Sequence, residues 1–169
     1  MFIEISSAQL IVGYNNVFVK GNKMNLLTIS WESVGKTTGT LNEVMGTEEL
    51  TSVDEEGAVY GDYIDTWDMS AGNWGATYYY VNQPSWNGYD EDLKKDLDYT
   101  DTWMDVDGYP VDIEMVSGSS FWLFHKGADI EALPFAGQVT ASSQGYTLTG
   151  GKMNLCGNPF ATNLNLNDK

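Results

Sequence analysis

The chain has 169 residues, of which 42% are hydrophobic and 13% aromatic. This length allows one domain with a buried core, and the apolar content is too high for a disordered acidic tail. The 24 acidic residues outnumber the eight lysines, and the formal net charge is −16 with no arginine. Nucleic acids and anionic membrane surfaces are recognised by clusters of basic residues, so we expect neither as a partner. No apolar run is long enough to predict membrane insertion.

The composition predicts an all-β fold, as an antiparallel sandwich or barrel-like module with at most one or two short helical turns. Tyrosine and tryptophan, which favour pleated and half-exposed surfaces, outnumber phenylalanine. Eighteen glycines and only four prolines are typical of short strands joined by tight turns.

The first predicted strands are short. Residues 10–14 and 17–20 are β-prone, and Asn15-Asn16 between them predicts a turn. A longer strand over residues 24–31 follows, long enough to cross the core.

Residues 40–46 are the best candidate for a helical turn. Thr40 is a good N-cap, and Glu43 stands three residues later, as in a capping box. Gly46 then predicts the stop.

The middle of the chain predicts an aromatic hairpin followed by a polar loop. Residues 60–68 form one strand, residues 70–75 a turn, and residues 76–82 the returning antiparallel strand. Residues 90–101 are the most polar stretch and are expected to be a loop.

The last predicted elements lead into a repeated segment. Residues 113–115 and 121–125 are expected to pair as two strands around Gly118, and residues 133–139 form a final strand.

Residues 7–33 and 136–162 are two copies of one segment, aligned without a gap at an offset of 129 residues. Gly21 aligns with Gly150, and Lys-Met-Asn-Leu occurs at residues 23–26 and again at 152–155. Such self-similarity marks a module boundary inside the chain. We expect a β module in residues 1–140 and the start of a second repeat in residues 141–169.

The second copy is too short to bury its apolar face alone. We expect it either to close the sheet of its own chain or to add a strand to a neighbouring chain. Both alternatives stay open. The predicted packing or assembly residues are Met24, Leu26, Trp31, Met153, Leu155 and Phe160.

Acidic residues near position 105 form a candidate metal site. Asp105, Asp107, Gly108 and Glu114 match positions 3, 5, 6 and 12 of a calcium loop, but position 1 is a tryptophan with no side-chain oxygen. A hairpin turn at Asp107-Gly108, with φ above zero at both residues, is the simpler interpretation. Calcium bound in another geometry is the alternative, with candidate ligands Asp101, Asp105, Asp107 and Glu114.

Aromatic residues form a candidate carbohydrate site, because sugar rings pack on aromatic faces beside polar side chains. The candidates are Trp67, Trp74, Tyr78, Trp86 and Trp103. Cross-strand pairing in a sheet explains the same residues without a ligand. Strand alternation predicts that Tyr78 and Tyr80 face one side of the sheet and Tyr79 the other.

The single histidine and the single cysteine give no catalytic motif. His125 stands at a strand end and is expected on the surface, and no G-x-S-x-G elbow accompanies it. Cys156 lacks a disulfide partner and is expected to be a small buried hydrophobic residue. We therefore predict no catalytic residues.

Two segments resemble elements of uncharacterised secreted bacterial β modules. Residues 151–160 are similar to a G-x-N-x-[VI]-G-N-P-[FY] segment of such modules, and residues 118–122 are similar to their G-x-[GS]-F-W element. The resemblance implies an extracellular or cell-surface location and carries over no catalytic residue.

These patterns predict a non-enzymatic extracellular structural module whose copies self-assemble as fibres or a layer by strand addition. A carbohydrate-binding module that uses exposed tryptophan and tyrosine is the alternative. The expected partners are other copies of the chain or, in the alternative, a polysaccharide. Calcium is the only candidate cofactor.

Overall fold

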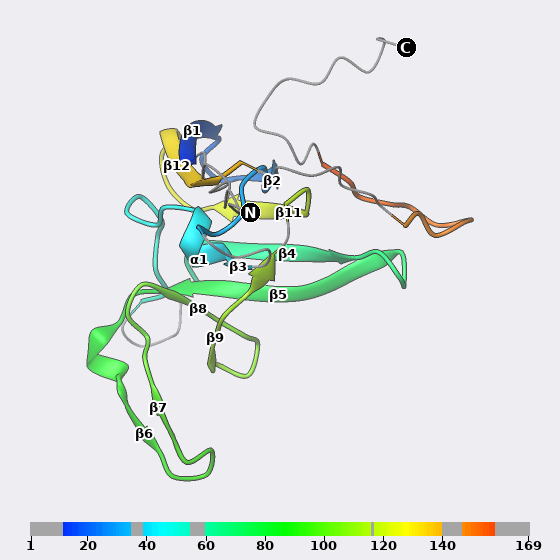
Figure 1. The fold of residues 1–169 in the computed structure, drawn as a ribbon. Helices are drawn as coiled ribbons and strands as arrows, with labels where there is room; N and C mark the ends of the chain where they lie inside the picture. Colours follow the sequence, from blue (N-terminus) through cyan, green and yellow to red (C-terminus); the bar gives the residue numbers. More distant parts are fainter. Residues whose placement is uncertain (1–11, 35–38, 55–59, 116, 140–146, 158–169) are drawn as a thin grey trace, which may run out of the picture.

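The computed structural model describes residues 12–34, 39–54, 60–115, 117–139 and 147–157. Within these ranges the chain is all-β and antiparallel, which confirms the predicted fold class (Figure 1). The elements are β1 (Val12–Val19), β2 (Lys23–Thr28), β3 (Gly39–Thr40), α1 (Leu41–Val44), β4 (Tyr63–Asp68), β5 (Asn73–Val81), η1 (Pro84–Trp86), β6 (Gly88–Asp90), β7 (Lys95–Leu97), β8 (Thr102–Met104), β9 (Pro110–Val111), β10 (Glu114–Met115), β11 (Ser120–His125) and β12 (Ile130–Gln138). Neither helical segment in these ranges has the length and apolar character needed to cross a bilayer.

One six-stranded sheet organises the molecule, in the order β2-β11-β4-β5-β8-β9. Strand β2 lies at one edge and β9 at the other. The pair β1–β12 lies across the β2–β11 end of the sheet, and the β6–β7 hairpin projects away from the opposite end (Figure 1). The arrangement is sandwich-like, because the β1–β12 pair and the large sheet share one hydrophobic core.

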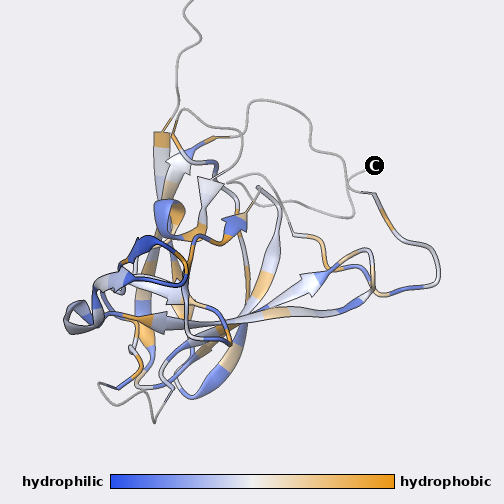
Figure 2. Cartoon of the chain, turned by 90° about the horizontal axis from the view of Figure 1, so that it is seen from below, coloured by the Kyte–Doolittle hydropathy of each residue, from blue (hydrophilic) through white to orange (hydrophobic). Residues whose placement is uncertain are grey.

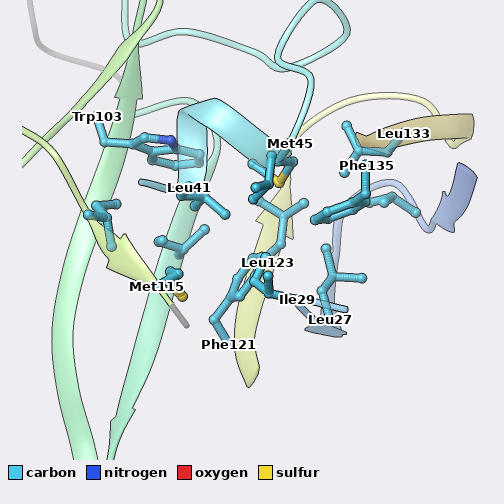
Figure 3. Packing of buried hydrophobic residues seen from close by; sticks show 14 of the residues in the cluster. Leu27, Ile29, Leu41, Met45, Trp103, Met115, Phe121, Leu123, Leu133 and Phe135 are labelled. Atoms are coloured by element: carbon cyan, nitrogen blue, oxygen red, sulfur yellow. The ribbon is translucent and has the colours of Figure 1, made fainter. Parts of the chain in front are cut away.

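That core lies between the inner face of the sheet, helix α1 and the β1–β12 pair. Its labelled members in Figure 3 are Leu27, Ile29, Leu41, Met45, Trp103, Met115, Phe121, Leu123, Leu133 and Phe135. Alternation along the strands directs these side chains into the core. On β11, Phe121 and Leu123 are fully buried, while Trp122 and Phe124 on the other face are partly exposed. Hydrophobic and hydrophilic bands accordingly alternate along the strands (Figure 2). Each fully buried side chain of this size contributes about 1.5–3 kcal/mol.

The predicted helical turn is confirmed. Thr40 is the N-cap of α1, and its backbone N–H donates to Oε2 of Glu43 at 3.0 Å. The helix buries Leu41 and Val44. It ends before Gly46, whose N–H leaves the helix and donates to the carbonyl of Pro134 at 2.8 Å.

The turn predicted at Asn15-Asn16 is wrong, because both residues lie inside the continuous strand β1. There Asn15 is opposite Phe135 and Asn16 is opposite Pro134 on β12. The Asn15 side chain accepts a hydrogen bond from Nε1 of Trp31 at 2.6 Å. Ladder pairing and this bond override the local turn preference of asparagine.

The loop predicted over residues 90–101 is also only partly correct, since β6 and β7 form a hairpin there. Asp90 closes its turn, because one carboxylate oxygen accepts the N–H groups of Asp92 at 2.9 Å and Leu93 at 2.8 Å. Lys94 completes the turn with φ of 53°. A short polar hairpin of this kind has no hydrophobic alternation from which it could be predicted.

The predicted pairing of residues 113–115 with residues 121–125 is wrong. Strand β10 pairs with β3, with Glu114 opposite Thr40. Strand β11 has β2 on one side and β4 on the other, so both of its edges are already occupied. By contrast, β4 and β5 form the expected aromatic hairpin, and β12 begins three residues before the predicted final strand.

Candidate functional site

The repeated segment forms a turn that is closed by an asparagine side chain. In the first copy, which we call the first-copy turn (residues 20–25), the N–H of Lys20 donates to Oδ1 of Asn25 at 2.8 Å. Nδ2 of Asn25 donates to the carbonyls of Lys20 and Lys23, both at 3.0 Å. Asn22 adopts a φ of 54°, which reverses the chain between β1 and β2.

The second copy forms the same turn. In the second-copy turn (residues 149–154), the N–H of Thr149 donates to Oδ1 of Asn154 at 2.8 Å. Nδ2 of Asn154 donates to the carbonyls of Thr149 at 3.1 Å and Lys152 at 2.9 Å. Gly151 has a φ of 73° at the position of Asn22. Each bond is displaced by the 129-residue offset, so the turn of the repeated segment is also repeated in three dimensions.

The first-copy turn is docked on the turn between β11 and β12. The N–H of Gly21 donates to Oδ1 of Asp129 at 2.9 Å, and the N–H of Asn22 donates to the carbonyl of His125 at 2.7 Å. Nζ of Lys20 forms an ion pair with Oδ2 of Asp129 at 2.5 Å. These contacts lower the pKa of Asp129, with the Lys20 bond as the largest cause and the Gly21 N–H next.

The second-copy turn lies instead at the tip of the β4–β5 hairpin, where the orange segment of Figure 1 runs beside it. Oγ1 of Thr149 donates to the carbonyl of Met69 at 3.0 Å, and Nζ of Lys152 donates to the carbonyl of Ala71 at 2.6 Å. Nε1 of Trp67 donates to the carbonyl of Met153 at 3.2 Å. The docking partner of the second turn is therefore different from that of the first.

Several apolar side chains of the second copy remain in solvent. Leu148 is 64% exposed and Met153 is 62% exposed. Cys156 is exposed as well, which corrects the prediction that it is buried. The reason is that residues 152–157 do not form a strand here, whereas their counterparts 23–28 form β2.

The predicted assembly residues separate into three groups. On β2, Met24 and Leu26 point to solvent, with exposures of 38% and 48%. Trp31 is buried in the core. Leu155 is half-buried beside Met69, whose sulfur accepts its N–H at 3.2 Å. The sixth residue, Phe160, lies outside the described residues.

The predicted carbohydrate residues do not form one site. Trp103 is fully buried in the core against Tyr80, so its prediction as an exposed sugar platform is wrong. Tyr78 packs partly buried on the same core, as strand alternation with Tyr80 predicts. Trp86 stacks edge-on against Tyr99 in a separate small cluster.

Two of the predicted tryptophans do meet, on the outer face of the sheet. Trp67 and Trp74 are T-shaped with ring centroids 5.5 Å apart, and Trp74 lies 6.3 Å from Trp122. They continue into a row of aromatic rings that we call the outer aromatic face. Its members are Tyr60, Tyr63, Trp67, Trp74, Tyr79, Trp122 and Phe124.

Five of the seven members of this face were not among the predicted carbohydrate residues. Tyr60 stacks on Tyr79 at 4.2 Å, and Tyr63 stacks on Phe124 at 5.0 Å, around an open depression of about 580 Å³. Asp65 also lines the depression. Burial, followed by the charge of Asp65, raises the pKa of Tyr63 above its ordinary value. Alternation along residues 121–125 could have placed Phe124 opposite the core, but only the fold joins it to Tyr63.

The candidate calcium ligands are engaged in separate local structures. Asp101 accepts hydrogen bonds from Oγ1 of Thr47 at 2.6 Å and from the Tyr80 hydroxyl. Glu114 lies on β10. Asp96, Asp98, Asp101 and Asp112 line an open depression of about 300 Å³. Among the described residues, no group of three or more His, Cys, Asp or Glu side chains is arranged to hold a metal ion.

Asp105 and Asp107 belong to the hairpin turn between β8 and β9, as the simpler interpretation predicts. Oδ1 of Asp105 accepts the N–H groups of Asp107 at 3.0 Å and Tyr109 at 2.9 Å. Gly108 has a φ of 86°, but Asp107 does not have a positive φ, so that detail of the prediction is wrong. The Asp105 side chain holds the turn by accepting these backbone N–H groups, so a second residue with positive φ is not needed.

His125 is buried, so its predicted surface position is wrong. Its Nδ1 lies 2.7 Å from Oδ2 of Asp62, which is fully buried, and its Nε2 lies 2.7 Å from the carbonyl of Ala128. Oδ1 of Asp62 also accepts the N–H of Lys126 at 2.7 Å. Burial raises the pKa of Asp62 in spite of these donors. Both ring nitrogens are engaged, so the pair joins the end of β11 to the segment before β4.

Comparison with known proteins finds no matching family model, no matching curated protein and no matching solved structure.

Proposed function

We propose that this chain is a non-enzymatic structural module of an extracellular or cell-surface assembly, and that copies join through the C-terminal half-repeat. One observation carries the proposal. The same asparagine-closed turn occurs twice, docked on a module in the first copy and presenting exposed apolar side chains in the second. A unit that is built into the sheet in one copy, and that in the other is held at a hairpin tip with apolar side chains exposed, is suited to joining modules.

The edge position of β2 supports joining by strand addition. The segment that the second copy repeats includes an edge strand of the large sheet. Segments that pair at sheet edges drive association, because they offer unpaired backbone groups. The net charge of −16 keeps separate copies soluble by repulsion, so association should strengthen when salt screens that charge.

The test is the mass of the purified full chain over a range of concentration and salt. We expect dimers and larger species by light scattering at high concentration, and fibres or sheets by negative-stain microscopy. A chain that stays monomeric at high concentration in both low and high salt would contradict the proposal. The extracellular setting is tested separately, by locating the protein in its cells.

A carbohydrate-binding module is the second candidate, and the outer aromatic face favours it. Stacked rings beside Asp65 and Thr77 offer both a packing surface and hydrogen-bonding groups. The acidic chain suits a neutral polysaccharide. Tryptophan fluorescence should then shift with neutral polysaccharides, and Trp74→Ala should remove the shift while the matched Tyr89→Ala change on β6 should not. No shift in the wild type would contradict this candidate.

Calcium stays a prediction from the sequence. A cation that binds only the folded chain must raise its melting temperature. An unchanged Tm in EDTA would contradict it.

A further inference from the structure

We propose that residues 149–157 dock on a second copy of this chain, in the site that residues 20–28 occupy on their own module. This inference rests on the proposed function, since it names the surface through which copies would join. It identifies the acceptor as the turn between β11 and β12 together with the exposed edge of β11 left when β2 is displaced.

Two glycines carry the argument. A Cβ at Gly21 would lie 2.2 Å from the carbonyl oxygen of Gly127, so only glycine lets the first-copy turn approach the β11–β12 turn. Gly150 stands at the equivalent position, but a side chain there would meet no such overlap within the described part of the chain. Beyond its chain neighbours, no described atom lies within 4 Å of the Cβ it would have, and its φ is not left-handed. Glycine at 150 is explained if the second-copy turn makes the same close approach to another chain.

The acceptor site binds the first-copy turn mostly through backbone N–H groups of the turn, and the second copy has the same groups. The site binds the N–H of Gly21 through Asp129 and the N–H of Asn22 through the carbonyl of His125. Gly150 and Gly151 carry the equivalent N–H groups. The turn that holds them in place is the same, because Asn154 closes it as Asn25 closes the first.

The strand that follows the turn also fits. In the β2–β11 pairing, Met24 is opposite Phe124 and Leu26 is opposite Trp122. The second copy has the same residue types at these places, Met153 and Leu155. At the next position, Leu27 is 5% exposed in the core, and its counterpart is Cys156. Docking in this register would bury the Cys156 thiol.

The second copy is the weaker occupant, which makes the exchange conditional. Thr149 cannot form the ion pair that Lys20 makes with Asp129. Gly151 cannot form the bond that Nδ2 of Asn22 donates to the carbonyl of Gly127 at 2.8 Å. The resident first copy therefore keeps the site in a single chain, and the second copy of a neighbour enters when the first copy is weakened or when copies are concentrated.

A cycle of two glycine substitutions in the full chain tests the inference. Gly21→Ala removes the first-copy turn from its site by overlap with Gly127, and Gly150→Ala is the matched change in the second copy. We expect Gly150→Ala to leave the unfolding midpoint unchanged. We expect Gly21→Ala to associate to at least twice the mass of the chain by light scattering, and the double variant to remain monomeric with a lower midpoint.

A second variant keeps the test decisive if Gly21→Ala does not fold. Lys20→Thr with Asn22→Gly gives the first-copy turn the residues of the second and introduces no overlap. This variant should associate more strongly than the wild type, and adding Gly150→Ala should remove the gain. A monomeric Lys20→Thr/Asn22→Gly variant would overturn the inference.

The outcomes separate this inference from the proposed function. Wild-type assembly that survives Gly150→Ala would overturn the docking site while leaving a self-assembling module. A monomeric wild type with a Gly21→Ala variant that associates through Gly150 would support the docking site and contradict the proposed function.

Discussion

Asn25 and Asn154 share three equivalent hydrogen bonds, and the surroundings of the two turns decide what each residue contributes. Asn25 closes a turn that is docked on Asp129 and His125, between two strands of the fold. Asn154 closes a turn whose described contacts are with the tip of the β4–β5 hairpin. Loss of the first turn should therefore loosen the module, whereas loss of the second should affect association.

We expect Asn25→Ala to lower the free energy of unfolding by about 1–3 kcal/mol, since four hydrogen bonds to backbone groups are lost, including the bond from Nδ2 to the Leu123 carbonyl on β11. The matched Asn154→Ala change should lower it by less than about 0.5 kcal/mol, because the turn that it closes lies at a hairpin tip and can open while the core stays intact. Urea unfolding of the two variants measures both values. Equal losses would contradict the different roles of the two turns.

Trp103 and Trp74 form a second pair in which burial decides the role. We expect Trp103→Ala to lower the free energy of unfolding by about 3–5 kcal/mol, because its fully buried ring leaves a cavity in the core. Trp74, which is 56% exposed, should change it by about 0.5 kcal/mol or less when replaced by alanine. Thermal and urea unfolding check the pair, and a small effect at Trp103 would contradict its place in the core.

At the scale of elements, the sequence predicted the structures that depend on residues close together in the chain. The α1 turn follows from Thr40 and Glu43, and the β4–β5 hairpin follows from its alternation. The pairing of β10 with β3 and the continuity of β1 depend on partners far away in sequence, which no local pattern specifies. The same holds for the outer aromatic face, where β11 brings Phe124 to Tyr63.

The burial of His125 is an element-scale effect of the same kind. Its strand-end position favours solvent, but the segment before β4 places Asp62 against it. The β11–β12 turn then supplies the Ala128 carbonyl. A single histidine among 24 acidic residues gives no indication of which acid it will meet.

The β11–β12 turn also gives a prediction on pH. The pKa of Asp129 lies below its ordinary value of 3.8, because Lys20 and the Gly21 N–H favour the charged form. The stabilisation from this carboxylate is therefore fully present above pH 3.8 and is lost as the pH falls through its lowered pKa in the folded chain. We expect Asp129→Asn to destabilise the chain at neutral pH, with a difference from the wild type that shrinks in acid. A difference that grows in acid would contradict this assignment.

At the scale of the whole molecule, the described residues form a sandwich-like arrangement, and a second copy of the asparagine-closed turn follows β12. The sequence repeat predicted that the repeated unit exists, but not that its turn forms without its strand. The difference has a physical reason. The turn closes on its own asparagine, whereas a strand equivalent to β2 would need the edge of β11, which is already paired with β2 and β4.

The reactivity of Cys156 tests the joining of copies through this unit most directly. It is the only cysteine, it is exposed in the single chain, and its counterpart Leu27 is buried beside β11. We expect the rate of maleimide labelling to fall as the chain is concentrated into assemblies. A control chain with Cys156→Ser and Met153→Cys should stay reactive, because the counterpart Met24 remains 38% exposed in the docked register. Equal labelling of Cys156 in monomer and assembly would contradict docking through the second copy.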